Sequence, residues 1–186
     1  MWGNSPWVQI PSPPLRVVTR LDDLPYRGAV NDSTIHSDLS DEGAMCLALL
    51  EAAGAPEHGD VPVGAVIVVG GLVIASRHNE RERDTDPTAH AELLALRDAA
   101  AHLGRWRLNE ATMFVTLEPC PMCAGALVAA RLGRLVFGAS DPRAGACGSV
   151  YNLCSDPRLN HEFPVEGGVM AEEAGTLLTT FFAGLR

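Results

Sequence analysis

The sequence predicts an α/β fold in which a mixed β-sheet has helices packed on both of its faces. Segments with helical periodicity alternate with short apolar runs, in the order helix, strand, strand, helix, strand, helix, strand and a closing helix. The first of these strands, residues 61–69, is apolar nearly throughout, as expected for a strand that is buried on both faces. With 47% hydrophobic residues in a chain of 186, there are enough apolar side chains to form such a core.

The first element is a helix that is expected to begin after Ser40 and to end at Gly54 and Pro56. Ser40 is a suitable N-cap because its hydroxyl can accept a hydrogen bond from a free amide of the first turn. Asp41 and Glu42 follow it in the first turn, where the helix dipole favours negative charge.

A β-hairpin is expected next, with Gly70-Gly71 as the turn between strands at residues 61–69 and 72–76. Residues 77–87 are polar and predict a surface loop, which ends in the helix-start signal Asp86-Pro87-Thr88. The later elements are expected as a helix at 89–103, a strand at 113–117, a short helix at 121–130, a strand at 135–138, a loop at 141–160 and a terminal helix at 169–183.

The first forty residues differ in composition from the rest of the chain. They are rich in proline and serine and show neither helical nor strand periodicity, which is typical of a poorly packed segment. We therefore expect residues 1–40 to be a disordered extension, or the product of a misassigned start codon. A single domain is expected over residues 41–186.

Charge, hydropathy and cysteine count restrict the class of protein. The formal net charge of −9 argues against a protein that binds nucleic acid through its overall field, although a local arginine patch stays compatible with it. Neither an 18-residue apolar stretch nor a signal-peptide core occurs, so we expect a cytoplasmic protein. In that reducing compartment cysteines serve metals or catalysis more often than disulfides, and five cysteines cannot all pair within one chain.

Two short motifs carry the chemistry: His90-Ala91-Glu92, and Pro119-Cys120-Pro121-Met122-Cys123. Cysteines three residues apart at a helix start lie on the same side, and the helix dipole there favours the thiolates that bind metal. One histidine and two cysteines are suitable ligands for Zn²⁺. Three protein ligands leave the fourth tetrahedral position open, which is typical of a catalytic zinc site.

Alternatives remain for each motif taken alone. The cysteine pair is also compatible with a redox pair, or with a closed structural zinc site that adds Cys147 and Cys154. Residues two apart on a helix are separated by about 200° around its axis. His90 and Glu92 can therefore serve one metal-bound water only if the helix begins at this point.

Taken together, the two motifs resemble the signature of zinc-dependent nucleobase deaminases. The resemblance extends to the bacterial tRNA-specific adenosine deaminase family, within the cytidine/deoxycytidylate deaminase superfamily, over roughly residues 41–186. The matching segments are Val63-Gly64-Ala65-Val66, His78-Asn79, residues 86–92, residues 116–123, Phe137-Gly138-Ala139, Asp141, Gly145, Gly148-Ser149, Asn160-His161 and Phe181-Phe182.

The resemblance implies a three-layer α/β/α cytidine-deaminase-like fold with a five-stranded mixed sheet, in a homodimer. It implies hydrolytic deamination of adenosine to inosine at the wobble position of tRNA anticodons, adenosine 34, by zinc-activated hydroxide. His90, Cys120 and Cys123 would bind one Zn²⁺ per subunit, and Glu92 would be the general acid and base.

The resemblance also implies contacts to the tRNA anticodon stem-loop. Asn79 would contact the flipped base, Asp141 and the adjoining loop would touch the anticodon backbone, and Asn160 and His161 would lie near the same surface. Four arginines are available as phosphate contacts, with ordinary solvated surface as the alternative interpretation: Arg131, Arg134, Arg143 and Arg158.

Two other functions are compatible with the same zinc motifs. One is a guanine or cytosine deaminase that acts on free bases or nucleosides. The other is a catalytically silent zinc-stabilised module for RNA binding or assembly, which the presence of Glu92 disfavours because such a module does not need that carboxylate.

Overall fold

Side chains that alternate along the strands form two hydrophobic cores, one on each face of a five-stranded sheet. Ala65 and Ile67 of the first strand point into one core, and Val66 and Val68 point into the other. All four are buried, so the strand is covered on both faces, as its apolar sequence predicted. The structure is a computed structural model, and it describes residues 39–185.

The elements follow the predicted order, with three additions. They are α1 (Asp41–Ala52), η3 (Ala55–His58), β1 (Gly64–Val69), β2 (Leu72–His78), α2 (Arg81–Asp84), α3 (Ala91–Leu103), β3 (Thr112–Leu117), α4 (Pro121–Ala129), β4 (Arg134–Ala139), β5 (Val165–Gly167) and α5 (Ala171–Gly184). The residue pattern did not indicate η3, α2 or β5, which are only three or four residues long.

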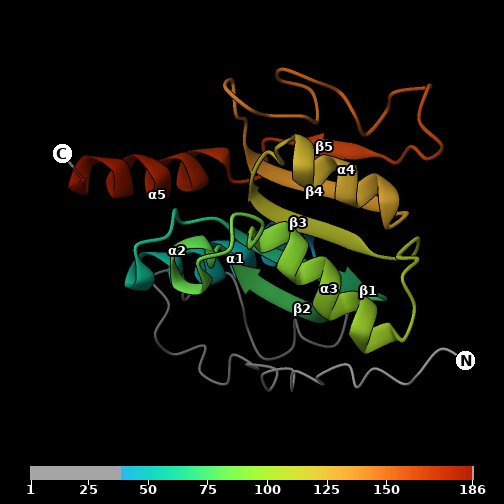
Figure 1. The fold of residues 1–186 in the computed structure, drawn as a ribbon, viewed down its shortest axis with the longest axis horizontal. Helices are drawn as coiled ribbons and strands as arrows, with labels where there is room; N and C mark the ends of the chain where they lie inside the picture. Colours follow the sequence, from blue (N-terminus) through green and yellow to red (C-terminus); the bar gives the residue numbers. More distant parts are fainter. Residues whose placement is uncertain (1–38, 186) are drawn as a thin grey trace, which may run out of the picture.

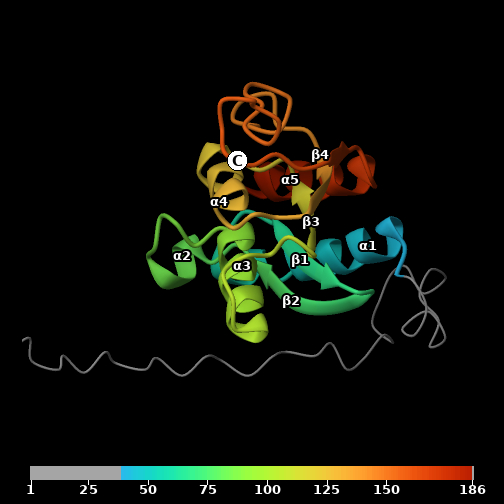
Figure 2. The same ribbon diagram turned by 90° about the vertical axis from the view of Figure 1, so that its right-hand side faces the viewer.

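The sheet order is β2-β1-β3-β4-β5. Strand β1 runs antiparallel to β2 and β3, whereas β3, β4 and β5 are parallel. Helices α3 and α4 cover one face, and α1 and α5 cover the other, so the fold has three layers (Figures 1 and 2). This architecture confirms the predicted α/β/α fold with a five-stranded mixed sheet.

The topology brings the ends of three strands to one edge of the sheet. Because β1 is antiparallel to both β2 and β3, these two neighbours point in the same direction, and β4 is parallel to β3. The segments that follow β2, β3 and β4 therefore leave the sheet at the same edge. This is the place where open α/β sheets bind ligands.

The approach of α1 to the sheet depends on Gly64, the first residue of β1. A Cβ atom at this position would overlap the backbone carbonyl of Ala48 and lie 2.5 Å from the backbone nitrogen of Ala52. Only glycine allows the helix to pack this closely, because any side chain would force the two backbones apart.

Helix α1 begins as expected, with the hydroxyl of Ser40 accepting a hydrogen bond from the amide of Gly43 at 3.1 Å. Helix α3 begins at Ala91 and not at residue 89, because Asp86 caps a preceding turn through the amide of Thr88 at 2.7 Å. The predicted extension at residues 1–40 lies almost wholly outside the described residues. In the described part of the chain, every helix is too short or too polar to span a bilayer.

Candidate metal centre and active site

The three candidate ligands lie at the N-terminal ends of two helices. His90 is the N-cap of α3, with an extended backbone (φ −78°, ψ 147°), and Cys120 is the N-cap of α4, with Pro121 in the first turn. Cys123 follows on the first turn of α4. The candidate ligands therefore lie at the positive dipole ends of both helices, which favours thiolates.

The distances among the ligand atoms fit one tetrahedral ion. His90 Nδ1 lies 3.9 Å from Cys120 Sγ and 3.6 Å from Cys123 Sγ, and all three atoms lie within 4.8 Å of one another. Zinc bonds of about 2.3 Å to sulfur and 2.0–2.1 Å to nitrogen place such atoms about 3.6 Å apart at the tetrahedral angle. His90, Cys120 and Cys123 therefore fit a zinc ion with one position left open.

The protonation of the two thiols is coupled. A hydrogen bond from Cys123, assisted by His90, lowers the pKa of Cys120 to about 4. The pKa of Cys123 is raised, because it donates that hydrogen bond and is buried. The hydrogen bond to Cys120 also raises the pKa of His90. Because thiols bind metal as thiolates, binding an ion would release the proton of Cys123.

Glu92 lies beside the candidate ligands on the first turn of α3. Its side chain is buried, with 4% exposure, and burial raises the pKa of the carboxyl. His90 stands outside the helix on extended backbone, so the 200° separation of a regular helix does not apply to this pair. Because α3 begins at Ala91, His90 and Glu92 meet the condition for serving one site.

Asn79 joins the end of β2 to the start of α3. Its side-chain oxygen accepts a hydrogen bond from the amide of Ala91 at 2.9 Å, and its side-chain nitrogen donates to the carbonyl of Val61 at 3.1 Å. Family resemblance predicted that Asn79 contacts the base. In the structure, its side chain binds the amide of Ala91, the residue between His90 and Glu92.

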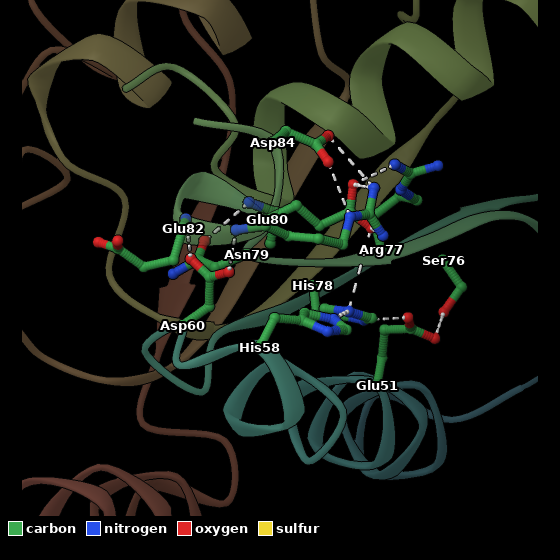
Figure 3. Close-up of polar contacts among 12 residues, drawn as sticks. Glu51, His58, Asp60, Ser76, Arg77, His78, Asn79, Glu80, Glu82 and Asp84 are labelled. Atoms are coloured by element: carbon green, nitrogen blue, oxygen red, sulfur yellow. Dashed lines mark hydrogen bonds and ion pairs between the residues drawn. The ribbon is translucent and has the colours of Figure 1, made fainter. Parts of the chain in front are cut away.

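The segment around Asn79 is held by a polar network (Figure 3). On one side, His78 Nδ1 lies 2.7 Å from Glu51 Oε1, and His78 Nε2 lies 3.2 Å from His58 Nε2. Burial alone would raise the pKa of Glu51, but hydrogen bonds from His78 and Ser76 outweigh it, and the pKa is lowered. This ionised carboxylate anchors the end of β2 to α1.

On the other side of Asn79, two buried carboxylates organise α2 (Figure 3). Asp60 accepts hydrogen bonds from the amides of Glu82 and Arg83 at 2.9 and 3.3 Å, which caps the short helix. Glu80 pairs with Arg77 and Arg83, each at 2.5 Å. These contacts fix the backbone on both sides of Asn79 and thereby support its contact with α3.

The loop after β4 carries Asp141, which the resemblance placed against the anticodon backbone. One carboxylate oxygen of Asp141 accepts hydrogen bonds from the amides of Arg143 and Ala144 at 2.9 and 3.2 Å. The side chain therefore shapes its own turn. Sequence reasoning missed Glu118, whose buried carboxylate binds this loop. Its position directly after a buried strand and before the Pro-Cys motif was the available signal.

Asn160 and His161 lie on a loop that packs on the segment after α4. Arg131 donates to the Asn160 carbonyl and side-chain oxygens at 2.8 and 2.6 Å, and His161 Nε2 lies 2.8 Å from the carbonyl oxygen of Leu132. The two residues help to line a shallow pocket of about 350 Å³. Its lining does not include the candidate metal ligands, so the structure brings these two residues together without joining them to the metal cluster.

The four candidate phosphate-binding arginines differ in how far their charge is neutralised. Arg134 pairs with Asp41 and Glu166, and Arg158 pairs with Asp156. Among the described residues, Arg131 and Arg143 have no carboxylate partner within ion-pair distance. The positive charge that remains available to a phosphate is therefore smaller than the sequence count indicated.

Cys147 and Cys154 do not join the candidate ligands. Both are buried, and their sulfur atoms lie 3.2 Å from each other. The cluster that can hold a metal ion within the described residues consists of His90, Cys120 and Cys123. The closed four-cysteine site that the sequence left open is therefore not formed.

Known proteins resemble this chain over most of its length. A family model described as MafB19-like deaminase matches residues 39–175. A tRNA-specific adenosine deaminase of Bacillus subtilis (strain 168) is 50% identical over 146 residues, which are 78% of this chain and 91% of that protein. A tRNA-specific adenosine deaminase of Haemophilus influenzae is 47% identical over 143 residues, or 76% of this chain and 83% of that protein.

Solved deaminase structures also resemble this chain. A structure from studies of A-to-I editing by tRNA:A34 deaminases superposes with a TM-score of 0.70 at 44% identity, over 73% of this chain and 98% of that chain. A guanine deaminase of Nitrosomonas europaea superposes with a TM-score of 0.68 over 81% of this chain and 91% of that chain. At 24% identity, the second likeness concerns the fold alone.

Proposed function

The chain belongs to the family of tRNA-specific adenosine deaminases, and from this membership we propose that it converts adenosine to inosine at the wobble position, adenosine 34, of tRNA anticodons. The observation that carries the proposal is the cluster of His90, Cys120 and Cys123 with the buried carboxylate of Glu92 beside it. A guanine or cytosine deaminase could use the same cluster, but the solved guanine deaminases match this chain at lower identity than the tRNA enzymes do.

The cofactor in this proposal is one Zn²⁺ per subunit, held by His90 Nδ1, Cys120 Sγ and Cys123 Sγ. The distances among these atoms support it, since they match a tetrahedral site for zinc. When bound, zinc supplies a nucleophile at neutral pH, because it lowers the pKa of coordinated water from near 16 to about 7. Two thiolates neutralise the charge of the divalent ion.

Glu92 moves the protons in the proposed reaction. Its carboxylate accepts a proton at the site of attack and delivers it to the adenine ring nitrogen adjacent to C6, which makes C6 electrophilic. Once the C6–O bond has formed, the carboxylate accepts a second proton, from the added hydroxyl group, and delivers it to the amino group. The C6–N bond then breaks, so that ammonia leaves and the C6 carbonyl of inosine forms. A raised pKa suits this work, because the carboxyl must both accept and donate a proton near neutral pH.

The remaining site residues bind and orient the substrate in the proposal. Asn79 contacts the flipped base with the hydrogen-bonding capacity that Ala91 and Val61 leave free. The loop of Asp141 and the surface of Asn160 and His161 receive the anticodon backbone. A flipped base in a tight pocket is recognised by shape and hydrogen bonds, so the net charge of −9 is compatible with an RNA substrate.

We further propose that the protein is a homodimer and that it acts in the cytoplasm. The homodimer is proposed from membership of the family, and the cytoplasmic location from the tRNA substrate, which is soluble. Size-exclusion chromatography with light scattering would separate a dimer from a monomer of 19.7 kDa.

The direct test is nucleoside analysis of a tRNA pool after incubation with the purified, zinc-loaded protein. Inosine at position 34 of a tRNA that carries adenosine there is the expected result. The same preparation should leave free guanine, cytosine and their nucleosides unchanged. Absence of inosine from a zinc-loaded, folded enzyme would contradict the proposal, and release of ammonia from guanine or cytosine would favour the alternative.

A further inference from the structure

Glu118 is a buried carboxylate without a cationic partner among the described residues. It follows β3 and lies two residues before Cys120, and only 2% of its surface is exposed. Burying an ionised carboxylate is costly unless hydrogen-bond donors replace the water that it loses. The hydrogen-bond donors around Glu118 therefore show which part of the chain its carboxylate stabilises.

All the hydrogen-bond donors to the Glu118 side chain come from one loop. Oε1 accepts the amides of Cys147 and Ser149, both at 3.0 Å, and Oε2 accepts the amide of Asp141 at 3.0 Å and the hydroxyl of Ser149. A single side chain thus binds both ends of the segment 141–149. In addition, the amide of Ala146 donates to the carbonyl of Pro119 at 2.8 Å.

Gly145 allows the loop to approach the carboxylate. A Cβ atom at this position would overlap the carboxyl group of Glu118 and lie 2.6 Å from the carbonyl oxygen of Asp141. The glycine is buried, and its amide donates to the same Asp141 carbonyl at 2.8 Å. The close packing of the loop on Glu118 therefore requires a residue without a side chain at 145.

The outer side of the same loop is exposed. Arg143 is exposed and has no ion-pair partner in the described part of the chain. Val150 and Tyr151 are 45% and 55% exposed, and both of their amides donate to the carbonyl of Gly145. A cation and an aromatic ring are the groups that contact the phosphates and bases of a single-stranded nucleic acid. On its inner side, the loop is bound by Glu118, which lies two residues before Cys120.

We propose that Glu118 is a positioning residue for substrate binding, which fixes the loop 141–151 in the conformation that receives the anticodon strand. This inference rests on the proposed function for the identity of the substrate. Its physical reason is preorganisation: a loop that is already folded does not lose conformational entropy when the RNA binds. The carboxylate acts through the loop and not on the reacting atoms, so it should affect KM more than kcat.

The first test is Glu118→Gln in the full-length, zinc-loaded protein. The NH2 group that replaces one carboxylate oxygen in glutamine cannot accept hydrogen bonds, so some of the four donors lose their acceptor. If the competent loop conformation falls to about a tenth of the population, KM for an anticodon stem-loop rises about tenfold. We expect kcat to change less than about threefold, zinc content to stay at one per chain, and the amides of Asp141, Cys147 and Ser149 to exchange hydrogen faster. The matched control is the exposed Glu110→Gln, which should leave all four measurements unchanged.

The second test keeps Glu118 and changes Gly145, the loop residue that packs against its carboxylate. Gly145→Ala places a methyl group against the carboxylate, so we expect the same rise in KM and the same faster exchange. Gly175→Ala on α5 is the matched control, because a Cβ atom there meets no other atom within 4 Å. If Glu118→Gln does not fold, Gly145→Ala decides the question.

The possible results separate this proposal from the proposed function. If the wild-type protein forms no inosine in tRNA, the proposed function fails, while hydrogen exchange still tests whether Glu118 holds the loop. The positioning role is overturned if both variants keep wild-type KM and amide protection. A fall in kcat at unchanged KM would overturn it as well, and so would loss of zinc with the loop amides still protected.

Discussion

The side-chain oxygen of Asn79 accepts a hydrogen bond of 2.9 Å from the amide of Ala91, the residue between His90 and Glu92. The end of β2 is thereby linked to the first turn of α3, where a candidate ligand and the candidate acid and base are adjacent. The other half of the Asn79 amide binds the carbonyl of Val61, ahead of β1. One side chain thus links the start of α3 to the segments that flank β1 and β2.

Asn79→Ala should lower the free energy of unfolding by about 1–3 kcal/mol, because it leaves the buried amide of Ala91 without its acceptor. Chemical denaturation of the zinc-loaded protein measures this loss. Asn109→Ala, at an exposed asparagine, should change stability by less than about 0.5 kcal/mol. Equal stability of the two variants would show that the contacts of Asn79 do not hold the helix.

Removal of a candidate ligand should remove the metal. We expect His90→Ala, Cys120→Ala and Cys123→Ala to fall from one zinc per chain to near zero, since two remaining ligands bind weakly. Melting temperature should fall with zinc content, because metal binding and folding are linked. Cys147→Ala is the informative comparison and should keep its zinc, measured by elemental analysis. Zinc loss in that variant would revive the four-cysteine alternative.

Glu92→Gln should strongly reduce turnover while keeping zinc and fold. Loss of a positioned acid and base removes about 10²- to 10⁴-fold in rate. The amide has nearly the shape of the carboxyl group but cannot exchange protons, so single-turnover kinetics on an anticodon stem-loop should show the loss in the chemical step. Substrate affinity should change little. Turnover at the wild-type rate would show that another group moves the protons.

The sequence allowed most elements to be predicted, because their signals are local. The turn Gly70-Gly71 and the N-cap Ser40 lie where they were predicted, and the apolar run forms β1, which begins at Gly64 and not at residue 61. Strand β5 was missed because its three residues show no alternation, and its pairing with β4 is set by tertiary packing. The start of α3 was placed two residues early, because Asp86 caps a turn and not the helix.

The candidate ligands could be predicted from motif spacing, but the contacts that hold them could not. His90 lies 30 residues before Cys120, and only the common edge of the sheet brings the two together. The carboxylate of Glu118 binds amides 23 to 31 residues further along the chain. Such partners are backbone groups, which have no sequence signature, so a conformation-dependent role of this kind becomes visible only in the fold.

Arg143 and Arg158 should differ in their effect on RNA binding, although each substitution by alanine changes the net charge equally. Arg143 is exposed and unpaired among the described residues, whereas Arg158 is neutralised by Asp156 at 2.6 Å. We expect Arg143→Ala to weaken binding of an anticodon stem-loop and to reduce the slope of log K against log salt by about 0.7–0.9. Arg158→Ala should leave the slope nearly unchanged. Fluorescence anisotropy across a salt series measures both, and equal slopes would mean that Arg143 does not contact phosphate.

The pair of Glu51 and His78 should give the protein a specific dependence of stability on pH. Hydrogen bonds from His78 and Ser76 outweigh burial and lower the pKa of Glu51 from its usual 4.5. A lowered pKa means that the ionised form favours folding. Its contribution is therefore complete above the unfolded-state pKa and disappears as the pH falls through the folded-state value.

Glu51→Gln should accordingly cost about 1–3 kcal/mol of stability near pH 7, where the wild-type carboxylate is ionised and bonded to both partners. The difference between wild type and variant should shrink as the pH falls below 4.5. Urea denaturation at a series of pH values measures it, with the exposed Glu57→Gln as a control that should differ by less than about 0.5 kcal/mol. A difference that stayed constant down to pH 3, or that grew on acidification, would show that ionised Glu51 does not stabilise the end of β2.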